Sequence, residues 1–247
     1  MALSFSSLPA RLPVRFYPLG DAAIVLEFGT SISEATHRSI LAAAAYLDQH
    51  TFPGFIEYVP AFTTLTVYYD PWQTSEAGQL NPYESVAETL RRLLEQVPPA
   101  VTDAPAPVVE IPVCYGGAHG PDLQEVARHV GVTPAEVIKL HTQPTYLVYM
   151  LGFAPGFPYL GGMNQRLTTP RKTQPRALVP VGSVGIAGPQ TGIYSLPTPG
   201  GWQLIGRTPQ PLFTPATSPP SLLQAGQRLR FVAISEREYQ QRQPHEL

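Results

Sequence analysis

The residues best suited to chemistry lie between Gly152 and Thr208, a stretch that combines glycine and proline turns with aromatic and basic side chains. From Val137 to Ser235 the chain has eight Lys and Arg residues and no Asp or Glu. Arginine forms paired hydrogen bonds with carboxylates and phosphates, and glycine turns can present backbone N–H groups to an anion. We therefore expect this half of the chain to hold negative charge. A basic face that only aids solubility, or that docks on the acidic first half, fits the charge pattern equally well.

Eight residues of this half are selected as site candidates. Three are predicted to be catalytic: His141, Arg171 and Arg176. Five are predicted to bind the substrate or an anion: Phe157, Tyr159, Gln190, Thr191 and Arg207. The arginines would bind anions, the two aromatic residues would form walls, and His141 is the only histidine of the acid-free segment and hence its only proton carrier. The alternatives are barrel core for the aromatic residues and a satisfied turn for Gln190 and Thr191.

The same residues exclude several kinds of site. Without carboxylates the segment cannot form an acid–base pair or hold Mg²⁺ through acidic ligands. The chain has no phosphate-binding P-loop motif, and Gly182–Gly185 lacks the spacing of a nucleophile elbow. A single cysteine, Cys114, excludes an internal disulfide and a cysteine-rich metal site. We predict no metal ligands in this chain.

Composition indicates a globular protein of the cytoplasm. The 247 residues carry a formal net charge of −2 and are 43% hydrophobic, with no apolar run long enough for a membrane span and no secretory signal at the start. A charge near zero without a basic helix argues against a nucleic-acid partner.

The first half predicts an α+β domain over residues 1–96. Strand-like segments and two helical segments follow one another in the order β-β-α-β-β-α, which indicates an antiparallel sheet with helices on one face. The helices are expected to begin at the caps Ser33 and Asn81, the latter with Pro82 in the first turn. Residues 97–107 contain four prolines and predict an extended linker.

Residues 108–247 predict a second domain made mainly of short strands. Helices are expected only at residues 121–130 and 133–141, and turn residues are frequent elsewhere, which is typical of a β-barrel. Residues 229–234 are expected to form the terminal strand, and residues 236–247 a charged tail.

Long motifs in both halves resemble one protein family. They are RFYPLGDAAIVLEFG, VPAFTTLTVYYDP, GFAPGFPYLGGMNQRLTTPRK and VPVGSVGIAGPQTGIYSLPTPGGWQLIGRTPQPLF. These segments are similar to the family of the 5-oxoprolinase B subunit, also called allophanate hydrolase subunit 1, which includes the Kip inhibitor of a sporulation histidine kinase. The resemblance covers nearly the whole chain.

The resemblance implies a cyclophilin-like barrel and a role in an enzyme complex. With two 5-oxoprolinase partners, a homologous C subunit and an A subunit, the chain would open 5-oxo-L-proline, a small carboxylate, to L-glutamate at the expense of ATP. ATP and Mg²⁺ would belong to the assembled complex, with neither bound tightly by this chain alone, and the missing carboxylates would come from a partner. The alternative function is inhibition of a sensor histidine kinase. Prolyl isomerase activity rests on fold analogy alone.

Overall fold

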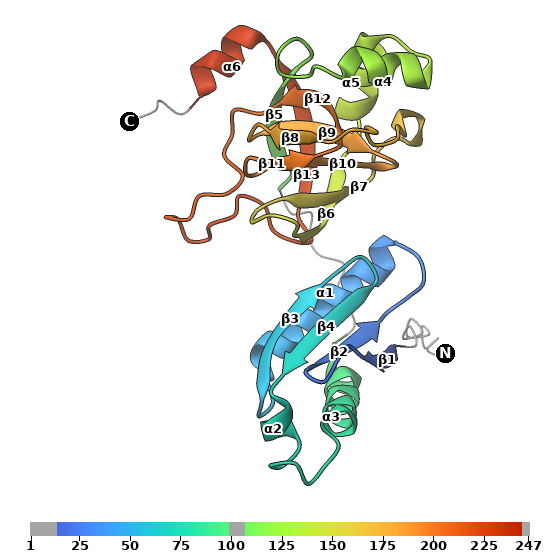
Figure 1. The fold of residues 1–247 in the computed structure, drawn as a ribbon, viewed down its shortest axis with the longest axis vertical. Coiled ribbons are helices and arrows are strands. Elements are labelled where there is room, and N and C mark those ends of the chain that lie inside the picture. Colours follow the sequence, from blue (N-terminus) through green and yellow to red (C-terminus); the bar gives the residue numbers. More distant parts are fainter. Residues whose placement is uncertain (1–13, 99–106, 244–247) are drawn as a thin grey trace, which may run out of the picture. The chain divides into compact units, whose positions relative to one another are not determined.

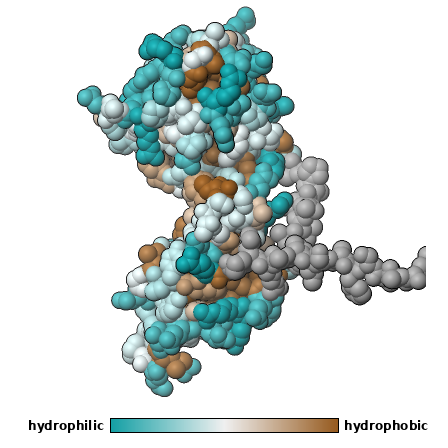
Figure 2. Space-filling view, turned by 90° about the vertical axis from the view of Figure 1, so that its right-hand side faces the viewer, coloured by the Kyte–Doolittle hydropathy of each residue, from teal (hydrophilic) through white to brown (hydrophobic). Residues whose placement is uncertain are grey.

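The computed structural model describes residues 14–98 and 107–243, which belong to two compact units, residues 1–102 and 103–247. Most of the predicted linker, residues 97–107, lies outside the described residues. Hydrophilic residues cover most of the face shown in Figure 2, with smaller apolar patches on each unit. Among the described helices, none has the length and apolar character that a membrane crossing requires.

The first unit is built on a four-stranded antiparallel sheet with the order β1-β2-β4-β3. Its strands are β1 (Arg15–Pro18), β2 (Ala23–Glu27), β3 (Phe55–Pro60) and β4 (Thr64–Tyr69). Its helices are α1 (Glu34–Gln49), α2 (Pro71–Thr74) and α3 (Pro82–Gln96). The sheet and the two long helices enclose one apolar core, which contains Leu26, Ile40, Leu65 and Leu90 (Figure 1).

Local signals explain where these helices begin. The Ser33 hydroxyl accepts a hydrogen bond from Thr36 N, and the Asn81 side chain accepts one from Glu84 N. Asp70 caps α2 in the same way, through Trp72 N. Because Asp70-Pro71 also reads as the end of a strand, the sequence did not predict this short helix.

The second unit is a closed barrel of seven strands in the order β10-β7-β6-β13-β5-β12-β9, so the predicted barrel is confirmed (Figure 1). These strands are β5 (Val109–Tyr115), β6 (Tyr146–Leu151), β7 (Pro158–Gly161), β9 (Ser183–Ala187), β10 (Gln190–Ile193), β12 (Gln203–Arg207) and β13 (Arg228–Ile234). The strands β8 (Arg176–Val179) and β11 (Thr198–Gly200) pair with each other in a separate ribbon. Three helical segments precede β8: α4 (Leu123–Val130), α5 (Pro134–Thr142) and the short η1 (Gln165–Leu167).

The prediction of a charged tail after residue 235 was wrong over its first part. Glu236–Arg242 form the helix α6, and Ser235 and Glu238 close a reciprocal capping box at its start. Tyr239 of this helix is 2% exposed. The S-x-x-E signal was present in the sequence, but the abundance of charged residues after it obscured the helix.

Closure of the barrel leaves no room for a side chain at Gly120. A Cβ atom at this position would collide with the backbone carbonyl of Ile205 in β12. A backbone atom can yield only if the strand moves, so the loop before α4 requires glycine here.

We therefore expect Gly120→Ala to lower the free energy of unfolding by about 1–3 kcal/mol, the usual cost of overpacking. Urea denaturation measures this value. The matched control is Gly201→Ala, because a Cβ atom at Gly201 meets only ordinary contacts of 3.6–3.7 Å. Equal stabilities of the two variants would contradict this packing argument.

Candidate functional site

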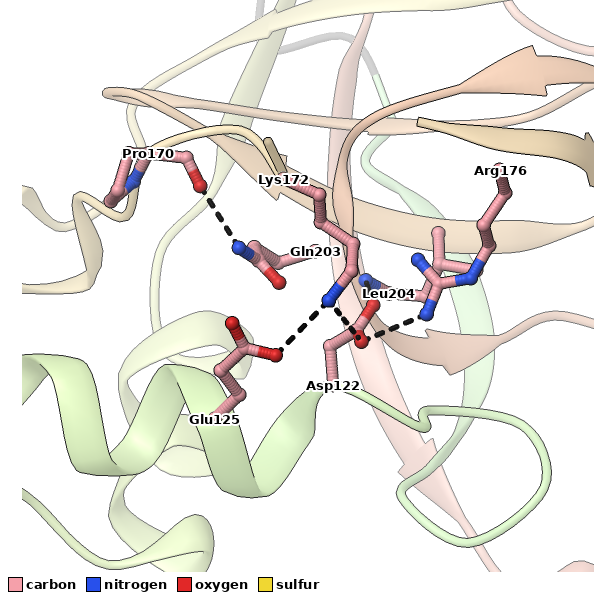
Figure 3. Close-up of polar contacts among 7 residues, drawn as sticks. All are labelled: Asp122, Glu125, Pro170, Lys172, Arg176, Gln203 and Leu204. Carbon is pink, nitrogen blue, oxygen red and sulfur yellow. Dashed lines mark hydrogen bonds and ion pairs between the residues drawn. The ribbon is translucent and has the colours of Figure 1, made fainter. Parts of the chain in front are cut away.

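A buried carboxylate, that of Asp122, organises the charged groups beside the barrel (Figure 3). Asp122 occupies the cap position of α4, yet its side chain makes no capping hydrogen bond. Instead, Oδ2 accepts from Leu204 N at 2.7 Å, while Oδ1 accepts from Lys172 Nζ at 3.1 Å and from Arg176 Nη2 at 2.8 Å. Lys172 Nζ also reaches Glu125 Oε2 at 3.0 Å. Helix α4, strand β12 and two basic residues are therefore tied to one carboxylate.

These contacts keep Asp122 ionised. Burial alone would raise the pKa of its carboxyl, but the hydrogen bonds from Arg176, Leu204 N and Lys172 outweigh burial and lower that pKa. The basic segment is thus not free of acids in space. Four acids of the same unit of this chain neutralise part of its charge: Glu110, Asp122, Glu125 and Glu136.

Arg176 is only half engaged by this network. Its Nη2 atom binds Asp122, whereas Nη1 is buried and has no hydrogen-bond partner among the described residues. The neighbouring Arg171 is exposed. Burial raises the pKa of the Tyr194 phenol, and a Trp202 backbone hydrogen bond and the charges of both arginines oppose that rise, so both guanidinium groups act on this hydroxyl. We call Arg171, Arg176 and Tyr194, together with Phe153, the Arg171 corner.

Aromatic rings pack edge to face behind this corner. Phe157 contacts Phe153, Tyr159, Tyr194 and Trp202 with ring centroids 5.3–5.6 Å apart. Phe157 and Tyr194 are each 2% exposed, so Phe157 lies in the core, and the half-buried Tyr159 lies beside it. The exposed ring is that of Phe153, at 63%.

Phe153 carries a backbone conformation that non-glycine residues rarely adopt. Its φ is 65°, in the left-handed region, which costs about 1–3 kcal/mol and is found most often where a site requires it. The strained turn holds an apolar ring in solvent, with its centroid 6.4 Å from that of the Tyr194 ring. Sequence analysis gave Phe157 and Tyr159 as walls and did not select Phe153, because strain is invisible in the sequence.

The structure places His141 inside the barrel, away from any surface. The side chain has no exposed area, and its Nδ1 lies 2.8 Å from Tyr115 Oη and its Nε2 2.9 Å from Thr191 Oγ1. The Thr191 hydroxyl donates its hydrogen to the Gly185 carbonyl at 2.9 Å, so it can only accept from His141. His141 is therefore protonated at Nε2, and Tyr115 donates to Nδ1.

This geometry argues against the predicted catalytic role of His141. Burial lowers the pKa of His141 to about 3, and a neutral imidazole with both nitrogens bonded in the core cannot exchange a proton with substrate. Thr191, predicted to bind substrate, is its buried partner. The two residues are brought together, but as a polar link between α5 and β10.

The remaining candidates are separate from this link. The half-buried Gln190 pairs with Ala187 in the β9–β10 hairpin. Arg207 Nε donates to the Val181 carbonyl at 2.7 Å, which ties its guanidinium to the β8–β9 turn. The residue that sequence reasoning missed is Asp122, which looks like an ordinary helix cap in the sequence. Tyr194 is one of several aromatic residues between Gly152 and Thr208, and nothing in the sequence singles it out.

A cavity of about 370 Å³ adjoins the Asp122 network at Glu125. Its lining consists of Glu125, Arg128, His129, Thr169, Pro170 and Gln203. This lining combines a carboxylate with a guanidinium, so it lacks the positive excess that an anion requires. The Arg171 corner carries two arginines with one guanidinium nitrogen unused, and we place the candidate site there.

Comparisons with known proteins cover nearly the whole chain. The family described as "Carboxyltransferase domain, subdomain C and D" matches residues 14–223. The chain is 52% identical to the 5-oxoprolinase B subunit of Bacillus subtilis (strain 168), over 90% of this chain and 93% of that protein. It is 44% identical to the 5-oxoprolinase B subunit of Escherichia coli O157:H7, over 90% of this chain and 97% of that protein.

Solved structures agree with this relationship. The crystal structure of TTHA0988 has a TM-score of 0.74 at 39% identity, and the match covers 90% of this chain but 41% of TTHA0988, so the chain spans about two fifths of that protein. Urea amidolyase of K. lactis has a TM-score of 0.72 at 17% identity, over 95% of this chain and 16% of that protein, and this likeness shows the fold alone.

The buried state of His141 predicts a pH dependence of stability. The pKa of His141 is about 3 in the folded chain, whereas the ordinary value of 6.5 applies to the unfolded chain. On acidification the unfolded chain is therefore protonated at this residue first. The free energy of unfolding should therefore fall as the pH drops from about 6.5 towards 3, by about 1.4 kcal/mol per pH unit from this residue. Urea denaturation across this range should give a shallower slope for His141→Gln than for the wild type. The exposed His129→Gln is the control, and a slope unchanged in both variants would refute this prediction.

The Asp122 network predicts a large effect of a one-atom change. Asp122→Asn keeps the shape but removes the charge that Lys172 and Arg176 share, and should lower the free energy of unfolding by about 3 kcal/mol, the lower end for a buried pair because both cations keep some solvent. The matched control is Glu125→Gln, whose side chain is 51% exposed and which should cost less than about 1 kcal/mol. Chemical denaturation of both variants tests the difference, and equal losses would show that Asp122 is not the central group.

Proposed function

The chain belongs to the family of the 5-oxoprolinase B subunit, and we propose that it is one component of an ATP-dependent 5-oxoprolinase that opens 5-oxo-L-proline to L-glutamate. The observation that carries this proposal is the 52% identity to a protein named as the B subunit of 5-oxoprolinase, over 93% of that protein. A protein with this name implies companions in a complex. We propose that these are a homologous C subunit and an A subunit, and that the complex acts in the cytoplasm.

The Arg171 corner suits the proposed substrate. At neutral pH 5-oxo-L-proline has one carboxylate and a flat lactam ring. A guanidinium binds a carboxylate with paired, charge-assisted hydrogen bonds. The exposed Arg171 can donate such bonds at the surface, and the buried Nη1 of Arg176, which has no partner among the described residues, can donate another from the protein side. The exposed ring of Phe153 can pack on the lactam face. In this proposal the corner binds and orients the substrate, and the barrel has the cyclophilin-like fold that the family resemblance implies.

The corner also suits the charge that lactam opening creates. Attack on the lactam carbonyl places negative charge on its oxygen, and a fixed positive group near that oxygen lowers the barrier. Asp122 fixes Arg176 before substrate arrives, so no ordering of this side chain is needed on binding.

The Mg²⁺ that accompanies ATP in phosphoryl transfer does not fit the residues of this corner. Magnesium binds oxygen ligands, chiefly carboxylates, and the acids nearest to the corner are occupied by Lys172 and Arg176. We therefore assign this chain no step that involves the nucleotide, and we propose that ATP and Mg²⁺ are held elsewhere in the complex. Because the described acids nearest to the corner are paired, we propose that the chain is inactive alone.

Arg171→Ala tests the proposal in the reconstituted complex. Purified chain mixed with its partner proteins, 5-oxo-L-proline and ATP should release glutamate and ADP. Loss of one hydrogen-bonded charge pair costs about 1.5–3 kcal/mol, so kcat/KM should fall roughly 10- to 100-fold. Arg166→Ala is the matched control, because Arg166 is also exposed and basic but faces Glu136 at 3.8 Å.

Two outcomes would contradict the proposal. Glutamate release that proceeds equally well without this chain would remove it from the enzyme, and inhibition of histidine kinase autophosphorylation by the same preparation would support the regulatory alternative. Equal kinetics for wild type, Arg171→Ala and Arg166→Ala would place the substrate away from the Arg171 corner.

A further inference from the structure

Three potential metal ligands meet on the part of the barrel where α6 docks. They are Cys114 at the end of β5, His119 in the loop before α4, and Glu236 at the start of α6, and their ligand atoms all lie within 4.8 Å of one another. Glu236 Oε2 lies 2.8 Å from His119 Nε2 and 3.5 Å from Cys114 Sγ. We call these residues the Cys114 cluster.

The fold brings these residues together by strand pairing. β13 runs parallel to β5 and places Ile234 beside Cys114, so the chain enters α6 directly above the thiol. His119 lies in the β5–α4 loop. The backbone N–H of His119 donates to the Gly116 carbonyl at 3.1 Å, and this hydrogen bond closes a turn of the loop. The three residues are therefore held by different segments of one rigid frame.

Neighbouring side chains orient two of the three ligands. Gln240 Nε2 donates to Glu236 Oε1 at 3.2 Å, which turns the other oxygen, Oε2, towards the cluster. The His119 ring packs on the buried Tyr239 ring with centroids 4.1 Å apart, and this contact aims Nε2 at the same point. Such supporting contacts around ligand side chains are typical of metal sites.

We propose that the Cys114 cluster binds one Zn²⁺ ion through Cys114 Sγ, His119 Nε2 and Glu236 Oε2, with water as the fourth ligand. One sulfur, one nitrogen and one oxygen form a donor set that suits zinc and not Mg²⁺ or Ca²⁺, which require oxygen. As the Zn–S bond forms, the thiol releases its proton to solvent. The Glu236 side chain is 57% exposed, so the fourth position faces water. The ion would fix α6 to the barrel, independently of the proposed 5-oxoprolinase function.

The competing explanation is an ion pair between His119 and Glu236, to which the Cys114 thiol only donates a hydrogen bond. That pair needs neither a sulfur ligand nor a bound ion. The two explanations differ in whether Cys114 contributes to metal affinity.

Cobalt titration of the full chain, stripped of metal with a chelator, tests the proposal. Co²⁺ takes zinc sites and reports a thiolate ligand by a charge-transfer absorption band. We expect this band to saturate at one Co²⁺ per chain, to disappear when Zn²⁺ is added, and to be absent in Cys114→Ser. His119→Ala should weaken Co²⁺ binding by more than about 10-fold, since loss of a supporting contact alone typically costs that much.

His129→Ala is the control, because His129 is an exposed histidine outside the cluster and its loss should leave affinity unchanged. Glu236→Gln, at an exposed position, gives a second ligand variant if Cys114→Ser does not fold, and it should also weaken binding. The absence of the band in the wild type, or equal affinities in wild type, Cys114→Ser and His119→Ala, would overturn the proposal and leave an ion pair only.

Discussion

The hydrogen bonds of one buried carboxylate hold the charged side of the barrel together. A buried charge is costly unless it is paired, and Asp122 meets this requirement with a backbone N–H from Leu204 and with Lys172 and Arg176. These partners lie 50 to 82 positions later in the chain. The start of α4, the segment around Lys172, and strands β8 and β12 are therefore placed relative to one another by a single side chain.

The same constraint explains how a cationic site can be pre-organised. The Asp122 carboxylate pairs with Lys172 and with Nη2 of Arg176, while Nη1 of Arg176 has no hydrogen-bond partner among the described residues. The charges of Arg176 and of the exposed Arg171 both act on the Tyr194 phenol. A large stretch of positive charge in the sequence is thereby reduced to a small group of fixed donors. The strained Phe153 adds an apolar surface to these donors. In our proposal, this is the binding surface for a small carboxylate with a flat ring.

Local patterns in the sequence predicted helix starts in the first unit and the barrel of the second unit, because strands, turns and caps depend on nearby residues. The caps Ser33 and Asn81 and the closed barrel are examples. The site was less accessible, because its geometry depends on contacts between distant segments. The charge count placed Asp122 outside the basic segment that contains Arg176, although Asp122 Oδ1 and Arg176 Nη2 lie 2.8 Å apart. His141 was selected because it is alone in its segment, but only three-dimensional structure reveals that both its nitrogens are bonded inside the barrel.

The most direct measurement is a crystal structure of the assembled complex with 5-oxo-L-proline bound. We predict that the substrate carboxylate lies within hydrogen-bond distance of Arg171 or of Arg176 Nη1, that Arg176 Nη2 remains bonded to Asp122, and that the Phe153 ring packs against the lactam. Ordered substrate that touches none of these groups would contradict the account.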